Sequence, residues 1–178
     1  MMVKQKPLKS IPPASLKSNS GFTLLELIGA IFILTVGIGS AFVLITQTLS
    51  AVSLVRERLI ASYLVQEGIE IVKNIRDTNW LQSRTATSTW DDGLLNGDWQ
   101  ADYLSQQLNQ LYIASPLNID ANGFYSYSAG TPTPFKRKIT ISEKTSDKTR
   151  VDVEVSWQER GRTHNFKALE YFTNWYEK

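Results

Sequence analysis

Glu26 is the residue whose type and position point most clearly to chemistry in this sequence. It is the only ionisable side chain between Phe22 and Thr46. A carboxylate near the centre of an apolar membrane segment costs about 2.5–3.5 kcal/mol, so such residues are rare and usually functional. Glu26 lies near the edge of the segment, where this cost is smaller, and the dipole of a helix that begins at Phe22 favours an anion there. The alternative is a glutamate at the lipid headgroup level that has no role.

Few other residues are candidates for catalysis. The chain has no cysteine, which excludes disulfides, thiolate chemistry and a cysteine-based zinc site. His164 is the only histidine, and no serine or aspartate accompanies it in a recognisable motif. The sequence also has no nucleophile elbow, phosphate loop or paired-carboxylate signature. We predict that the chain is not an enzyme, with no catalytic residue and no cofactor.

Two segments with acidic residues are candidate metal sites, and one of them matches a metal-binding loop in part. Asn118-x-Asp120-x-Asn122-Gly123 matches the opening of an EF-hand loop, but Ala129 stands where the bidentate glutamate is expected. A hairpin turn is therefore the favoured interpretation. The second segment comprises Asp91-Asp92-Gly93, Asp98 and Asp102. We interpret it as a solvated loop and predict no metal site.

The basic run Lys136-Arg137-Lys138 is a candidate contact for DNA or for a neighbouring subunit. Strand geometry places Lys136 and Lys138 on one face and Arg137 on the other, so the run is not one patch. We therefore predict a solvated edge strand whose charged side chains prevent pairing with another chain. The chain after residue 21 has 15 basic and 17 acidic residues, so nucleic acid is not an expected partner.

The amino-terminal part predicts a membrane topology. Residues 1–21 carry four lysines and no acidic residue, and the 25 residues from Phe22 to Thr46 are long and apolar enough for a transmembrane helix. The positive-inside rule places residues 1–21 in the cytoplasm and the chain after about residue 47 outside. An ordinary secretory signal is disfavoured because the apolar run is too long and no small-x-small cleavage site follows it.

A single helix is predicted from Phe22 to about Arg76. No proline lies between Pro13 and Pro116 to interrupt this helix. At Gly37 and Gly39 the helix either loosens locally or packs closely against another helix. The second half of this helix carries an apolar stripe at helical spacing, which must be covered by other parts of the chain. The stripe comprises Ala61, Val65, Gly68, Val72 and Ile75.

The carboxy-terminal part is predicted to be a β domain with an aromatic core, since all five tryptophans lie at or beyond residue 80. Alternating apolar and polar residues predict three late strands that form an antiparallel meander. The predicted strands cover residues 135–143, 150–158 and 163–173, with turns at 145–148 and 159–162. Residues 104–113 are ambiguous between helix and strand, and residues 129–134 are predicted to form a loop. We expect an α+β fold in which the meander packs one face on the helix stripe.

These features divide the chain into four expected segments. They are a basic cytoplasmic leader (1–21), the transmembrane half of the helix (22–46), its amphipathic half (47–79) and an outer aromatic-rich β domain (80–178).

The run Gly21-Phe22-Thr23-Leu24-Leu25-Glu26, between a basic leader and an apolar helix, resembles the signature of type IV pilins and of the pseudopilins of type II secretion. The resemblance implies that a prepilin peptidase cleaves after Gly21, that the new amine of Phe22 is N-methylated, and that Glu26 pairs with this amine in a neighbouring subunit. Opposite charges in a low-dielectric helix bundle offset each other's desolvation, which gives the pairing a physical reason. Many family members have a proline within the apolar segment, and this chain departs from that pattern.

The resemblance also implies a lollipop architecture and a set of partners. The partners are the prepilin peptidase, other pilin subunits through the amino-terminal helix, an inner-membrane assembly platform and membrane lipid. The expected function is that of a structural subunit, a minor pilin, in a type IV pilus-like filament. The expected location is the bacterial cytoplasmic membrane with the carboxy-terminal domain outside, and after processing an extracellular or periplasmic filament.

Two alternatives stay open at this point. The nearer one is a pseudopilin of a type II secretion or DNA-uptake machine. The other, from a different class, is a single-pass membrane protein whose outer domain binds a ligand.

Overall fold

The computed structural model describes residues 21–83 and 89–175. The chain divides into two compact units, Met1–Gln47 and Thr48–Lys178. The leader predicted over residues 1–21 lies, except for Gly21, outside the described residues.

In the first unit, the described residues form the beginning of one long helix, α1 (Leu24–Ser83). The helix is continuous through Gly37 and Gly39, although both are poor helix formers. Thr35 and Ser40 donate hydrogen bonds to carbonyl oxygens three residues earlier, so their hydroxyls are satisfied within the helix. A window of α1 has a mean hydropathy of 2.5, which makes the helix long and apolar enough to cross a membrane.

In the second unit, α1 continues to Ser83, past the expected end near Arg76. The five residues of the predicted stripe are all buried, which confirms the helical spacing found in the sequence. Three further helix residues share this buried face: Leu64, Ile71 and Trp80. The predicted pair between Glu70 and Lys73 forms on the exposed side, with 3.1 Å between Oε1 and Nζ.

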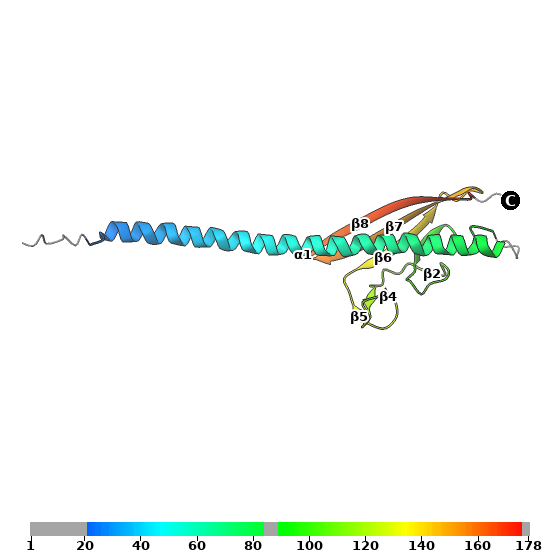
Figure 1. Ribbon diagram of the computed structural model, residues 1–178, viewed down its shortest axis with the longest axis horizontal. Helices are drawn as coiled ribbons and strands as arrows, with labels where there is room; N and C mark the ends of the chain where they lie inside the picture. The colour runs from blue at the N-terminus through cyan, green and yellow to red at the C-terminus, as the bar shows by residue number, and fades with distance from the viewer. Residues whose placement is uncertain (1–20, 84–88, 176–178) are drawn as a thin grey trace, which may run out of the picture. The chain divides into compact units, whose positions relative to one another are not determined.

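Two antiparallel sheets make up the rest of the second unit (Figure 1). The larger sheet has the strand order β2-β1-β6-β7-β8, and the smaller one has the order β4-β3-β5. The strands are β1 (Gly97–Gln100), β2 (Gln110–Leu111), β3 (Asn118–Ile119), β4 (Tyr125–Ser126), β5 (Thr131–Pro132), β6 (Lys136–Ser142), β7 (Lys148–Glu159) and β8 (Arg162–Thr173).

The last three strands form the predicted meander, β6-β7-β8. Glu159 and Arg162 face each other in the register, and Arg160 and Gly161 between them both have positive φ, as a two-residue hairpin turn of the primed type requires. Residues 104–113 contain no helix and only the short strand β2. Residues 129–134 are not a pure loop, because they contribute β5 to the small sheet.

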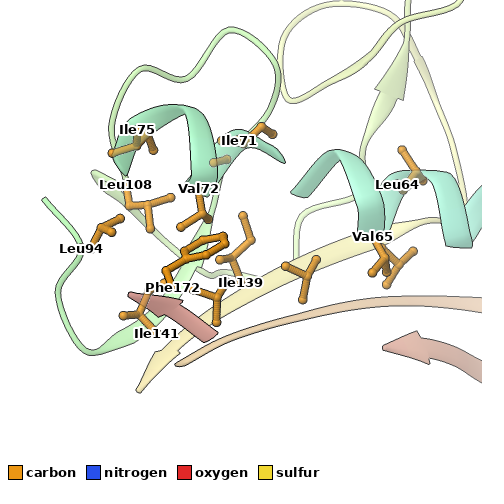
Figure 2. Packing of buried hydrophobic residues seen from close by; sticks show 14 of the residues in the cluster. Leu64, Val65, Ile71, Val72, Ile75, Leu94, Leu108, Ile139, Ile141 and Phe172 are labelled. Carbon is orange, nitrogen blue, oxygen red and sulfur yellow. The ribbon is translucent and has the colours of Figure 1, made fainter. Parts of the chain in front are cut away.

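The core lies between the second half of α1 and one face of the large sheet, as predicted. Alternate residues of β7 point toward the helix and are fully buried, including Val151, Val153 and Val155. Val72 of α1 and Phe172 of β8 belong to the same buried cluster as Ile139 and Ile141 of β6 (Figure 2). The fold is thus an α+β, pilin-like arrangement of a long helix on an antiparallel sheet.

Gly68 marks a close approach of helix and sheet. A Cβ atom at this position would lie 2.7 Å from Cγ1 of Val153 and 3.2 Å from Cδ of Arg137. Both neighbours are themselves buried, so neither has free space to move into. A side chain at position 68 would push the helix away from the sheet.

We predict that Gly68→Ala destabilises the outer unit. Overpacking of a dense core costs about 1–3 kcal/mol, which exceeds the gain of up to about 1 kcal/mol in helix propensity. Thermal unfolding of the full chain in detergent, followed by tryptophan fluorescence, should show a lower midpoint. Adding Val153→Ala should recover part of the loss, because it removes the atom that the new methyl group meets. A higher midpoint for Gly68→Ala alone would contradict the close approach.

Candidate functional site

The helix that carries Glu26 begins with a side-chain cap. Oγ1 of Thr23 accepts a hydrogen bond from the backbone N–H of Glu26 at 3.2 Å, and the carbonyl oxygen of Thr23 accepts one from Leu27 at 3.1 Å. Thr23 is therefore the N-cap residue, and Glu26 is the third residue of the helix. Thr-x-x-Glu before an apolar run is the sequence signature of such a start, and it could have located the helix start at Leu24 instead of Phe22.

Gly21 and Phe22 precede the cap and lie outside regular structure. Phe22 is 81% exposed, and apart from the adjoining residues no described atom lies within 4 Å of the place where a Cβ of Gly21 would be. The peptide bond between them is thus accessible and is not held in the hydrogen bonds of the helix.

Glu26 is exposed and lies in the first turn of α1, where the unpaired N–H groups of the helix favour a negative charge. Within the described residues, no cation forms an ion pair with it. Its carboxylate is therefore available to a partner outside this chain.

The helix around this carboxylate exposes a continuous apolar surface. Isolated soluble domains rarely expose apolar patches of this extent, so lipid or other helices must cover it. The exposed residues include Leu25, Ile28, Phe32, Ile38, Phe42 and Ile45.

Arg137 is not the solvated edge residue that the sequence predicted. β6 lies between β1 and β7, and the Arg137 side chain is fully buried against α1. Its guanidinium donates hydrogen bonds to the carbonyl oxygens of Leu64 (3.1 Å) and Ala101 (2.6 Å), and it forms an ion pair with Glu67 at 2.9 Å. The prediction was wrong because β1, which covers this strand, is distant in the sequence.

Arg137 links α1 to the large sheet and to the residue after β1, and we call this set of contacts the Arg137 clamp. Burial raises the pKa of Tyr127 to about 12, and its hydroxyl donates a hydrogen bond to the carbonyl oxygen of Arg137 at 3.1 Å. The lysines on either side of Arg137 point to the opposite face, as expected from strand alternation. The basic run therefore supplies one internal cation and no continuous surface for nucleic acid.

Asp120, the acidic residue of the first candidate metal loop, holds a turn. Oδ1 of Asp120 accepts hydrogen bonds from the N–H groups of Asn122 (2.8 Å) and Phe124 (2.9 Å), within the hairpin between β3 and β4. This confirms the predicted hairpin. Across residues 21–83 and 89–175, no group of three metal-ligating side chains is found.

The second acidic segment is not a cluster, because each carboxylate is engaged separately. Asp91 forms an ion pair with Lys144 at 2.9 Å, and Oδ1 of Asp98 accepts a hydrogen bond from Thr140. Asp102 is buried and binds the N–H of Tyr127 at 2.8 Å. The Asp98 contact joins β1 to β6 within the large sheet, and the other two contacts join residues outside the strands.

Asp152 faces away from the helix, as predicted, yet it is buried. Arg150 and Lys167 cover it, with ion-pair distances of 2.8 Å and 2.9 Å. Burial disfavours the charged form, but the hydrogen bonds from these two cations outweigh it and lower the pKa of Asp152. His164 on the neighbouring strand is stacked on Trp157, with 5.5 Å between the rings.

The comparisons with known proteins agree with the amino-terminal site. A family model, the prokaryotic N-terminal methylation motif, matches residues 16–42, which include Gly21, Phe22 and Glu26. No curated protein and no solved structure matches the chain. The chain therefore carries this motif at the start of an apolar helix, which supports the family of type IV pilins and pseudopilins and points to a structural subunit instead of an enzyme.

We predict that Arg137→Met destabilises the outer unit by about 3 kcal/mol. The substitution removes the guanidinium donor from the carbonyl oxygens of Leu64 and Ala101 and from the carboxylate of Glu67. Loss of one partner of a buried, hydrogen-bonded charge is strongly destabilising. Lys138→Met is the matched control, because Lys138 faces away from the helix and lies 3.9 Å from its partner Glu154. It should change the free energy of unfolding by less than about 0.5 kcal/mol. Denaturant unfolding of both variants checks the difference, and equal midpoints would disprove the clamp.

Proposed function

We propose that this chain is a precursor of a filament subunit, a minor pilin in a type IV pilus-like filament. A prepilin peptidase cuts it between Gly21 and Phe22, and the new amine of Phe22 is methylated. The observation that carries the proposal is the N-terminal methylation motif over residues 16–42, placed directly before an exposed apolar helix.

The local geometry supports the cleavage. The Gly21–Phe22 bond lies in irregular backbone ahead of the Thr23 cap, so a protease can bind it in extended form without unwinding the helix. The match with the methylation motif covers both sides of the bond. The basic leader of residues 1–21 favours the cytoplasmic side for this reaction.

Glu26 has the properties that assembly requires. Cleavage creates a cationic amine at Phe22, and Glu26 of another subunit is the anion that can neutralise it. In the low-dielectric interior of a helix bundle, the attraction between these charges offsets their desolvation and favours one axial register. The apolar surface on the same helix supplies the contacts that exclude water.

The proposed topology follows from the charge distribution and the helix. The apolar segment spans the bacterial cytoplasmic membrane, the leader stays inside, and the β domain lies outside. After processing, the subunit moves from the membrane into the filament with the help of an assembly platform. Other pilin subunits bind it through α1.

The processing step predicts a mature chain that begins at methylated Phe22. Mass spectrometry of the protein purified from membranes or filaments of its natural host should identify this amino terminus. Replacing Gly21 with a large residue (Gly21→Leu) should block the cut, whereas Ser20→Ala should leave it unchanged. An intact leader in assembled material would disprove the proposal.

Glu26→Ala should leave processing intact but exclude the subunit from filaments. The amine of the neighbouring subunit then lacks its anion, and an unpaired charge of this kind costs about 3–5 kcal/mol, or more than a hundredfold in incorporation. Sheared filaments and membranes, probed with an antibody against the outer domain, measure the two populations. Glu70→Ala, an exposed glutamate on the same helix, is the control. Normal incorporation of Glu26→Ala would refute the assembly role.

A further inference from the structure

The turn between β7 and β8 lies against α1 and forms a cavity with it. The cavity has a volume of about 450 Å³, within the range of ligand sites in proteins. Ser50, Ala51 and Leu54 of α1 line one side, and Arg160 and Arg162 of the turn line the other. The cavity is therefore amphiphilic, with methyl groups next to guanidinium groups.

The two arginines differ in how they are held. Arg160 donates a hydrogen bond to Oγ of Ser50, which fixes the turn against the helix. Arg162 is exposed, and no carboxylate in the described part of the chain forms an ion pair with it. Glu159 also lines the cavity, so two guanidinium groups face one carboxylate. The net charge of the lining is positive, and the planar donors of arginine suit the oxygens of a phosphate.

The position of the cavity along the chain is fixed by covalent spacing. The apolar segment ends at Thr46, and Ser50 follows one helical turn later, or about 6 Å along the helix. If residues 22–46 fill the hydrocarbon core, Ser50 and Arg160, which is hydrogen-bonded to it, lie in the headgroup layer, and Arg162 lines the same cavity. Only four residues separate Thr46 from Ser50 along the chain.

We propose that the cavity at the β7–β8 turn binds the headgroup phosphate of an anionic phospholipid in the outer leaflet. Arg162 and the remaining N–H donors of Arg160 bind the phosphate oxygens, and Ala51 and Leu54 contact the first carbons of the acyl chains. The inference rests on the membrane anchorage in the proposed function, and it does not require cleavage or assembly. The bound lipid holds the outer unit against the membrane before the subunit enters a filament.

Native mass spectrometry of the full-length, uncleaved chain tests this site. The protein is extracted from bilayers that contain equal amounts of phosphatidylglycerol and phosphatidylcholine, and the retained lipids are counted. The wild-type chain should retain phosphatidylglycerol in preference to phosphatidylcholine. Arg160→Gln/Arg162→Gln should reduce this preference on the order of tenfold, as expected for the loss of two cations at a membrane surface.

A control variant that loses the same number of positive charges distinguishes binding in the cavity from general attraction of the anionic lipid to the protein. Lys73→Gln/Lys148→Gln also removes two positive charges, but Lys73 lies more than twenty residues along α1 from Ser50, and Lys148 lies at the opposite end of β7 from Arg160. This control should retain phosphatidylglycerol as the wild-type chain does. Equal retention by the two double variants would overturn the proposal.

A second arm distinguishes lipid from soluble phosphate. Millimolar glycerol phosphate, added during extraction, should not displace the lipid, because it lacks the acyl chains that contact Ala51 and Leu54. Complete displacement would assign the cavity to a soluble phosphate and overturn the lipid proposal. Because the test uses the uncleaved chain, its outcome is independent of whether Phe22 becomes the mature amino terminus.

Discussion

The structure depends on a single helix that must satisfy two different environments. The first half of α1 is apolar on every side, so it needs lipid or other helices around it. The second half is amphipathic, and its stripe is removed from water by the large sheet. Without the sheet, residues 47–83 would be a long exposed helix whose stability in water is marginal. The β domain therefore serves first as the cover of its own helix.

Arg137 and Gly68 define how that cover is attached. Gly68 permits the close approach, and Arg137 binds a helix carbonyl, a helix carboxylate and a carbonyl next to β1. These directional contacts specify a rotation and a position of the helix on the sheet, which apolar packing alone specifies less strictly. The lysines beside Arg137 remain on the polar face.

The periodicity of the sequence is sufficient to predict the elements that have strong local patterns. The stripe from Ala61 to Ile75, the turn at Asn122-Gly123 and the three late strands all follow from spacing and turn chemistry, and the structure confirms them. The errors concern pairings between distant segments. β1 pairs with β6 although some forty residues separate them, and this pairing converts the predicted edge into an interior strand. The amino-terminal site was recognised through its motif, while the cap at Thr23 was overlooked although its signature is local.

The cap at Thr23 has a further consequence for the symmetry of assembly. Because the helix starts at Leu24, a chain that begins at Phe22 has its terminal charge only two residues before the helix and its carboxylate two residues after the helix start. The amino-terminal end of each such chain then carries a positive charge at Phe22 and a negative charge at Glu26, close together. Two such ends brought together by a twofold axis would satisfy each other and stop growth. In the proposed filament, an axial offset would instead leave one sign free at each step. The contact would then be heterologous and non-closing, and the polymer open and helical.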